Sequence, residues 1–327
     1  MRVFDLDDSV AGDLGHSPGA GAVAIGNFDG VHLGHRQVIG EVVERAKKLG
    51  VISSVMTFEP YPREYFNPTN APARLTTCRQ KMALFAQTGI NRAYCARFGK
   101  RLATTTAEDF VNNILLTQLN VTHVTVGADF RFGRARQGDV GLLADMGARH
   151  GFGVSVVADV ENDGNRISSS RIRALLAEGR LEDASKLLGR PFAYSGRVIH
   201  GDKRGRTWGF PTANFAVRRD SFPLSGVFVV EVSDTNGFHR YGVANVGRRP
   251  TINSTRLLIE AFLFDFSGDL YGQRLQVTFL ERIREERRFE SFDALKQQIG
   301  EDIEFAHRQI DADIMSDSKI KAQRKEG

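Results

Sequence analysis

Two histidines flank a glycine in the segment GNFDGVHLGH, residues 26–35, and this combination suits the binding of nucleotide phosphates. His32 and His35 lie three residues apart, so on the first turn of a helix their rings would share one face, and Gly34 leaves room for a ligand. Each imidazole can donate a hydrogen bond to a phosphoryl oxygen on which charge develops. Taken alone, an HxGH pattern is more often a pair of solvated or capping residues, and without a third well-spaced ligand it does not favour a zinc site.

The residues on either side of this segment predict a strand, a turn and a helix. The run AVAIGNF, residues 22–28, is apolar and stops at turn residues, which predicts a buried strand. Apolar residues then recur at intervals of three and four from Val38 to Leu49, and Gly50 supplies a stop. Because the first N–H groups of a helix lack intrahelical partners, this helix start favours an anion such as a phosphate.

Strand-like and helical patterns alternate through the first half of the chain, which predicts an α/β domain with a parallel sheet. Ligands bind such sheets beyond the carboxyl ends of the strands, where GNFDG, FEPYPREYF (58–66) and GADFRFG (127–133) are expected to lie. Further strands are predicted at 51–58, 92–98, 123–130 and 153–160, with helices at 81–87, 107–119 and 140–150.

Two of these segments combine aromatic rings with stiff or charged residues. Pro60 and Pro62 stiffen the loop after a strand so that a flat ring could pack there, although a structural proline turn explains them at least as well. In the other segment, Asp129 and Phe130 stand among arginines, a mixture that can stack on aromatic systems and pair with phosphates. A solvated basic loop is the alternative.

The segment NRISSSRIRALL, residues 165–176, leads into a predicted helix at 171–178. Its serines can cap that helix while its basic residues meet an anion. An ordinary cap needs one serine, whereas this segment holds three serines and three arginines. It is therefore a second candidate phosphate-binding segment.

Composition sets broad limits on the class of protein. A length of 327 residues suggests two domains, and an apolar share of 41% supports ordinary buried cores. The sequence shows no signal-peptide pattern or membrane-spanning run, so we expect a cytoplasmic protein without a membrane partner. The net charge of +5 suits polyphosphate ligands as well as nucleic acid, but acidic and basic residues are interspersed, so nucleic acid is not an expected partner. Cys78 and Cys95 have no metal or redox spacing, which favours buried thiols.

The second half of the chain changes character near residues 184–190, where we expect a domain boundary. Runs with alternating apolar residues at 226–232, 240–247, 257–266 and 273–283 predict an antiparallel barrel or sandwich. A closing helix is predicted from Ser291, its cap, to residue 310.

A glycine-rich basic stretch, HGDKRGRTWGFPTAN (200–214), opens this second domain. Its glycines permit close backbone approach to a ligand and its basic side chains offset phosphate charge, but the P-loop pattern is absent and a flexible basic loop is the plainer interpretation. Thr212 and Asn214 lie two apart, so in an extended segment they would point to one side and could hold Mg²⁺; turn capping is the alternative.

Together, GNFDGVHLGH, FEPYPREYF, GADFRFG, ISSSRIRALL, GFPTANF, VANVGRRPT and IEAFLFDFSGDLYG resemble bacterial bifunctional riboflavin kinase/FAD synthetases. The resemblance implies an α/β nucleotidylyltransferase-type parallel-sheet domain at 1–186, followed at 187–327 by a mostly antiparallel, six-stranded β-barrel domain with a C-terminal helix. It implies that the second domain phosphorylates riboflavin with ATP to FMN, and that the first adenylates FMN with ATP to FAD and pyrophosphate. Riboflavin, FMN, FAD and ATP are then the partners, Mg²⁺ is the cofactor, and a weak homo-oligomer is left open.

The resemblance also implies roles for individual residues. It makes His32 and His35 catalytic in adenylyl transfer and Glu260 the base of the kinase. ATP in the adenylyltransferase would meet Gly26, Asn27, Phe28, Asp29, Gly34, Asp129, Arg166, Ser169 and Ser170. The flavin there would meet Phe58, Pro60, Pro62 and Phe130; ATP in the kinase would meet Gly201, Lys203, Gly205, Gly209 and Pro211; and the metal would meet Thr212 and Asn214.

Three positions depart from the family pattern. Tyr61 stands where the family often has His, Ser170 replaces a frequent Thr, and Phe262 occupies another frequent His position, so we assign Phe262 no catalytic part. Two other functions stay open: an enzyme with one activity whose other domain has decayed, and a regulator that binds flavin or nucleotide without turnover.

Overall fold

The fold is described from a computed structural model, which covers residues 1–6, 20–200, 212–217, 221–250 and 255–323. Contacts divide the chain into two compact units. The first unit takes residues 1–171 and 187–189, and the second takes residues 172–186 and 190–327. Among the described residues, no helix is both long and apolar enough to cross a membrane.

The first unit is built on a six-stranded sheet in which every neighbouring pair of strands is parallel. The order across the sheet is β1-β4-β3-β2-β5-β6, so the predicted parallel α/β sheet is confirmed. The strands are β1 (Arg2–Leu6), β2 (Gly21–Ile25), β3 (Ile52–Glu59), β4 (Arg92–Arg97), β5 (Val121–Gly127) and β6 (Gly153–Val157).

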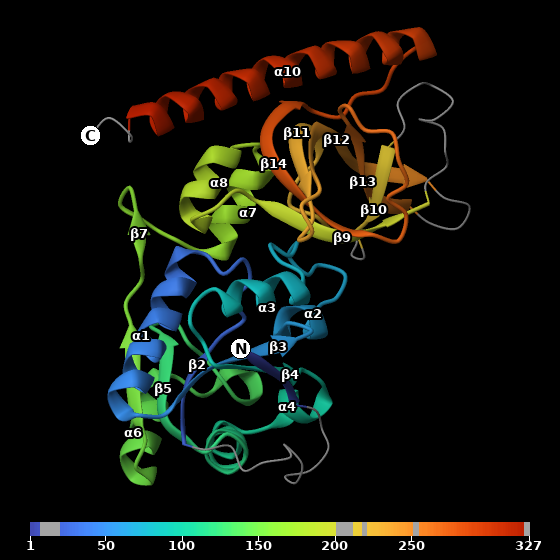
Figure 1. The fold of residues 1–327 in the computed structure, drawn as a ribbon. Helices are drawn as coiled ribbons and strands as arrows, with labels where there is room; N and C mark the ends of the chain where they lie inside the picture. The colour runs from blue at the N-terminus through green and yellow to red at the C-terminus, as the bar shows by residue number, and fades with distance from the viewer. Residues whose placement is uncertain (7–19, 201–211, 218–220, 251–254, 324–327) are drawn as a thin grey trace. The chain divides into compact units, whose positions relative to one another are not determined.

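Helices cover both faces of this sheet (Figure 1). On one face, α1 (Leu33–Leu49) and α3 (Cys78–Ala86) pack on alternate residues of the central strands, with Ile39 and Phe85 fully buried. On the other face, the π-helix η1 (Phe110–Gln118) and α6 (Val140–His150) enclose a second apolar core around Met56. The short helices are α2 (Pro62–Phe66), α4 (Lys100–Thr104), α5 (Ala107–Asp109) and η2 (Arg134–Arg136), and β7 (Glu161–Asn162) pairs with β8 (Asn165–Arg166).

The second unit contains a closed barrel of six antiparallel strands, so the barrel that the family resemblance implied is confirmed and a sandwich is excluded. Phe215, Phe228 and Phe279 fill its interior and are almost fully buried. Around the barrel run β10 (Thr212–Ala216), β13 (Thr255–Leu263), β12 (His239–Pro250), β11 (Gly226–Ser233), β14 (Arg274–Arg284) and β9 (Ala193–Ile199).

The predicted closing helix is the long α10 (Phe292–Gln323), which lies against the outside of the barrel (Figure 1). Ala306 and Ile310 face an apolar patch on the barrel that includes Phe264. Beside this patch the buried Asp302 carboxylate accepts hydrogen bonds of 2.8–3.1 Å from the Arg284 guanidinium of β14. The helices α7 (Ser169–Ala177) and α8 (Leu181–Leu188) precede the barrel in the chain.

Candidate active sites

The first candidate site is the turn between β2 and α1. Phe28, Gly30 and Val31 all have positive φ angles of 49°, 89° and 41°, so the chain turns sharply before the helix. Glycine is needed at Gly30, because a Cβ there would lie 2.9 Å from the Leu75 side chain in a backbone conformation that other residues rarely adopt. The turn delivers His32 to the N-cap position of α1.

The two histidines of this turn lie against each other. Their rings stack with centroids 3.5 Å apart, and the His32 Nδ1 accepts a hydrogen bond of 3.3 Å from the His35 backbone N–H. A nitrogen that accepts carries no proton, so the neutral His32 ring bears its proton on Nε2, which can donate to a phosphoryl oxygen. The Phe28 ring meets His35 edge to face at 5.4 Å.

The serine-rich segment joins the same turn. The Ser169 hydroxyl donates a 2.9 Å hydrogen bond to the Asp29 carbonyl, and Ser168 caps α7 by accepting from the Arg171 N–H at 3.2 Å. A Cβ at Gly34 would lie 3.3 Å from the His32 ring and 3.6 Å from the Ile167 carbonyl, so the small residue allows this close approach. The two segments selected from the sequence as phosphate-binding therefore lie in contact.

The Asp29 carboxylate points into the protein rather than toward the helix start. It is 3% exposed, and one of its oxygens accepts 3.1 Å hydrogen bonds from the Leu75 and Thr76 N–H groups and from the Tyr61 hydroxyl. Burial, followed by the negative charge of Asp29, raises the pKa of Tyr61 well above its ordinary value. Asp29 therefore stabilises the turn through hydrogen bonds on its buried side.

An ion-pair cluster brings together two residues from separate candidate segments. The Arg166 guanidinium lies 2.7 Å from the Asp129 carboxylate and 3.0 Å from that of Asp159. The hydrogen bond that the Arg166 guanidinium donates to the Asp129 carboxylate is the main cause of the raised pKa of Arg166, which stays charged. Because these side chains are about half exposed, the cluster contributes little to stability and is available to a ligand.

The aromatic candidates lie toward the carboxyl ends of the strands. Phe58, at the end of β3, meets Phe98 edge to face at 6.1 Å, and Phe130 stacks on Phe132 at 5.5 Å. Phe58 and Phe130 pack against the same apolar core. Pro60 is half-buried and Pro62 is the first residue of α2.

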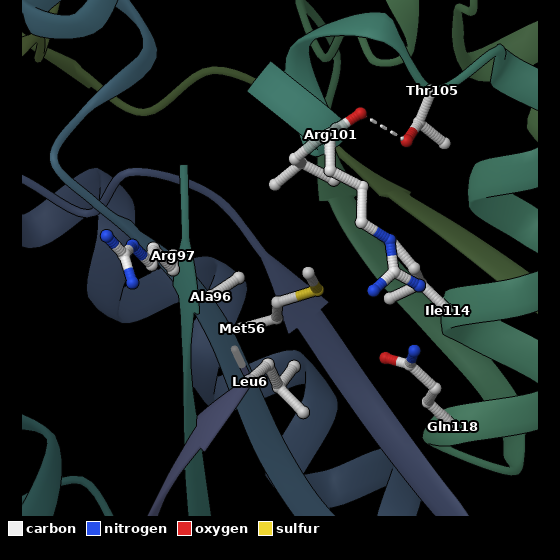
Figure 2. Close-up of a pocket in the computed structure, with 9 residues that line it drawn as sticks. Leu6, Met56, Ala96, Arg97, Arg101, Thr105, Ile114 and Gln118 are labelled. Carbon is white, nitrogen blue, oxygen red and sulfur yellow. Dashed lines mark hydrogen bonds between the residues drawn. The ribbon is translucent and has the colours of Figure 1, made fainter. Parts of the chain in front are cut away.

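A small recess lies near the ends of β1 and β4, beneath η1 and α4 (Figure 2). In Figure 2 the Arg101 side chain reaches toward Ile114 and Gln118, and its carbonyl accepts a 2.8 Å hydrogen bond from the Thr105 hydroxyl. None of the residues predicted to bind ATP or flavin lines this recess, and we assign it no part in the chemistry.

The second candidate site lies on barrel strands β10, β13 and β12. Asn214 is the register partner of Glu260, and Glu260 is also the partner of Asn245. Side chains of directly paired residues lie on the same face, so these three form a polar row on the face opposite the buried Phe215 and Ile259. Thr212 is on this face as well, and the Asn214 amide donates to its carbonyl at 3.2 Å. Gly201, Lys203, Gly205, Gly209 and Pro211 lie outside the described residues.

Comparison with known proteins identifies the family. The family model described as FAD synthetase matches residues 16–171, and the one described as riboflavin kinase matches residues 188–310. Bifunctional riboflavin kinase/FMN adenylyltransferases from Escherichia coli K12 and Pseudomonas fluorescens are 45% and 47% identical, covering 89% and 86% of this chain and 93% and 91% of theirs. The chain belongs to the bifunctional riboflavin kinase/FMN adenylyltransferase family. A crystal structure described as a macrolide-efflux protein from Streptococcus pneumoniae is 30% identical, with a TM-score of 0.77 over 91% of this chain and 97% of that one.

The adenylyltransferase candidates do not all lie in one place. His32, His35, Gly34 and Ser169 meet at the start of α1, while Asp129 and Arg166 meet in the ion-pair cluster. Asp29 lies in the interior behind the turn, together with Tyr61, which stands where the family often has His. Ser170 is exposed on α7. On the barrel, Phe262 is the register partner of Thr212 and packs against the apolar cluster under α10, and its lack of a catalytic part stays a prediction.

Sequence reasoning overlooked the buried polar residues that hold these elements. Lys81 and Thr57 contact the Asn27 carbonyl, and Arg74 forms ion pairs of 2.6 Å with both Glu59 and Glu64. Lys81 did carry a signal: it stands four residues before Phe85, on the face of a predicted helix that apolar residues should occupy. Asn245 had no local signal, because only strand register places it beside Glu260.

Proposed function

We propose that this chain makes FAD from riboflavin in two ATP-dependent steps at two separate sites. The barrel transfers the γ-phosphoryl group of ATP to riboflavin and gives FMN and ADP. The parallel-sheet domain then joins FMN to the AMP part of a second ATP and releases pyrophosphate. We assign these activities to residues 187–327 and 1–186, and, because both steps consume ATP, to the cytoplasm.

In the adenylyl transfer, the FMN phosphate attacks the α-phosphorus of ATP in line with the departing pyrophosphate. The attacking phosphate already carries negative charge near neutral pH, so no general base is required. Catalysis then depends on position and charge. His32 Nε2, His35 and the N-terminus of α1 stabilise the phosphoryl oxygens, Ser169 holds the second segment beside them, and Arg166 with Asp129 contacts the nucleotide.

In the kinase, Glu260 accepts the proton of the riboflavin hydroxyl as its oxygen attacks the γ-phosphorus. The row formed by Glu260, Asn214 and Thr212 offers carboxylate, amide and hydroxyl oxygens on one face, which are the ligands that Mg²⁺ prefers. We assign Thr212 and Asn214 to the metal. Mg²⁺ held there would neutralise phosphate charge. Asn214 is only 5% exposed, so its side chain is held in place by the residues packed around it.

The observation that carries this proposal is the contact between the HxGH helix start and the ISSSR segment, present in a chain that also has the Asn214–Glu260 pair on its barrel. The test is a product assay of the full chain with riboflavin, ATP and Mg²⁺. FMN and ADP should appear first, followed by FAD and pyrophosphate. FMN alone would show that the adenylyltransferase has decayed, and binding without any product would make the chain a regulator.

A further inference from the structure

A lysine is fully buried behind the phosphate-binding turn. Lys81 lies on α3 and is 0% exposed, among the largest side chains that the described structure buries completely. Burying an ammonium group is costly unless its donors are satisfied, whereas an apolar side chain could fill the same space without that cost. A buried lysine at this position therefore depends on acceptors for its ammonium group.

The Lys81 ammonium contacts three different elements. Its Nζ donates hydrogen bonds to the Thr57 hydroxyl at 2.7 Å, to the Asn27 carbonyl at 3.0 Å and to the Tyr61 hydroxyl at 3.4 Å. Thr57 in turn donates to the same Asn27 carbonyl at 3.1 Å. One buried group thus links the end of β3, the turn before α1 and the loop that precedes α2.

The charges around Lys81 favour its charged form only in part. Burial has the largest effect and lowers the pKa of Lys81 to about 8. The charge of Arg74 lowers this pKa further, and the charges of Glu59, Asp29 and Cys78 raise it. The group is therefore mainly protonated near neutral pH, with three donors for its three partners.

The link has a direct consequence for the turn. Asn27 precedes Phe28, Gly30 and Val31, whose positive φ angles set the course of the chain into His32. Fixing the Asn27 carbonyl fixes where that sequence of turns begins. Tyr61 stands between Pro60 and Pro62, so the same ammonium also holds the candidate flavin loop.

We propose that Lys81 is a positioning residue for adenylyl transfer, which holds the ATP-binding turn and the flavin loop in register without touching either substrate. The inference rests on the proposed function. It predicts that loss of Lys81 impairs FAD formation and leaves the riboflavin kinase, on separate barrel strands, unchanged.

The test compares Lys81→Met with Val55→Ala in the full chain, at a temperature well below either unfolding midpoint. Val55 is fully buried on β3, so Val55→Ala destabilises the same domain without removing a donor. Lys81→Met should lower kcat/KM for FAD formation from FMN about tenfold or more, with raised KM values for ATP and FMN, while Val55→Ala keeps the wild-type values. Riboflavin phosphorylation should be the same in all three chains.

A second variant guards against failure of Lys81→Met to fold. Thr57→Val nearly preserves side-chain shape but removes the hydroxyl that accepts from Lys81 and donates to the Asn27 carbonyl. Because Lys81 keeps its direct hydrogen bond to Asn27, this variant should raise the KM for ATP by a smaller factor than Lys81→Met. Wild-type kinetics in the folded Lys81 or Thr57 variant, or an equal loss in Val55→Ala, would overturn the inference alone. Absence of FAD formation by the wild-type chain would instead overturn the proposed function, and the inference with it.

Discussion

His32 combines a structural and a chemical task in one ring. Its Nδ1 caps α1 through the His35 N–H, which fixes the ring and leaves Nε2 as its donor. The sequence indicated both histidines by type and spacing, because a helix start constrains neighbours locally. It did not indicate that Asp29 points inward, because that depends on N–H groups of Leu75 and Thr76, more than forty positions away.

The two tasks of His32 can be separated by substitution. Asparagine is a good N-cap, so the free energy of unfolding of His32→Asn should lie within about 1 kcal/mol of the wild-type value. It lacks the imidazole donor, so FAD formation from FMN should fall about tenfold or more. The measurements are a thermal melt and the initial rate of FAD formation, with FMN formation from riboflavin as internal control. A full FAD rate would remove His32 from the chemistry.

Lys81 gives the stability of the first unit a defined dependence on pH. Burial lowers its pKa to about 8 in the folded chain, whereas an unfolded lysine keeps its proton up to about 10.4. Between these values the unfolded state binds more protons, so stability rises with pH. Relative to Lys81→Met, the wild-type free energy of unfolding should increase from about pH 8 to 9.5 with a slope approaching about 1.4 kcal/mol per pH unit. Urea unfolding at several pH values measures this, and a constant difference would contradict it.

At the scale of elements, most of the parallel sheet was readable from apolar runs and turn residues. The exception is β1, an edge strand that, among the described strands, pairs only with β4. Its Val3 is 50% exposed, so its sequence lacks the continuous apolar run that indicates a buried strand. The predicted helix at 107–119 begins as α5 and continues as the π-helix η1, a distinction of hydrogen-bond spacing that side-chain periodicity does not carry. The alternating apolar runs alone left a barrel or a sandwich open, because closure requires β9 to pair with both β10 and β14, and only the family resemblance implied the barrel.

The ion pair between Arg284 and Asp302 should fix α10 to the barrel. Asp302 is 2% exposed, so Asp302→Ala leaves the Arg284 charge without its carboxylate and should lower the free energy of unfolding by about 3 kcal/mol. Glu304→Ala, two residues further along the same helix and exposed, is the matched control and should change stability by no more than about 0.5 kcal/mol. Equal effects in denaturant unfolding would show that the ion pair does not stabilise the packing.

At the scale of the whole molecule, the two proposed activities use different parts of the chain. The adenylyltransferase candidates come from strand ends, a helix start and the segment up to Ser170, whereas the kinase row comes from β10, β12 and β13. Motif resemblance predicted this division, and the family comparison supports both halves. The boundary at residues 186 and 187 stays a prediction.

The most direct test of two independent sites is complementation between two variants supplied with riboflavin, ATP and Mg²⁺. Glu260→Gln should make little FMN from riboflavin yet still convert added FMN to FAD, while His32→Asn should accumulate FMN. An equal mixture of the two chains should produce FAD from riboflavin far faster than either alone, because FMN made by one chain serves the other. A mixture that makes no more FAD than its components would contradict the account.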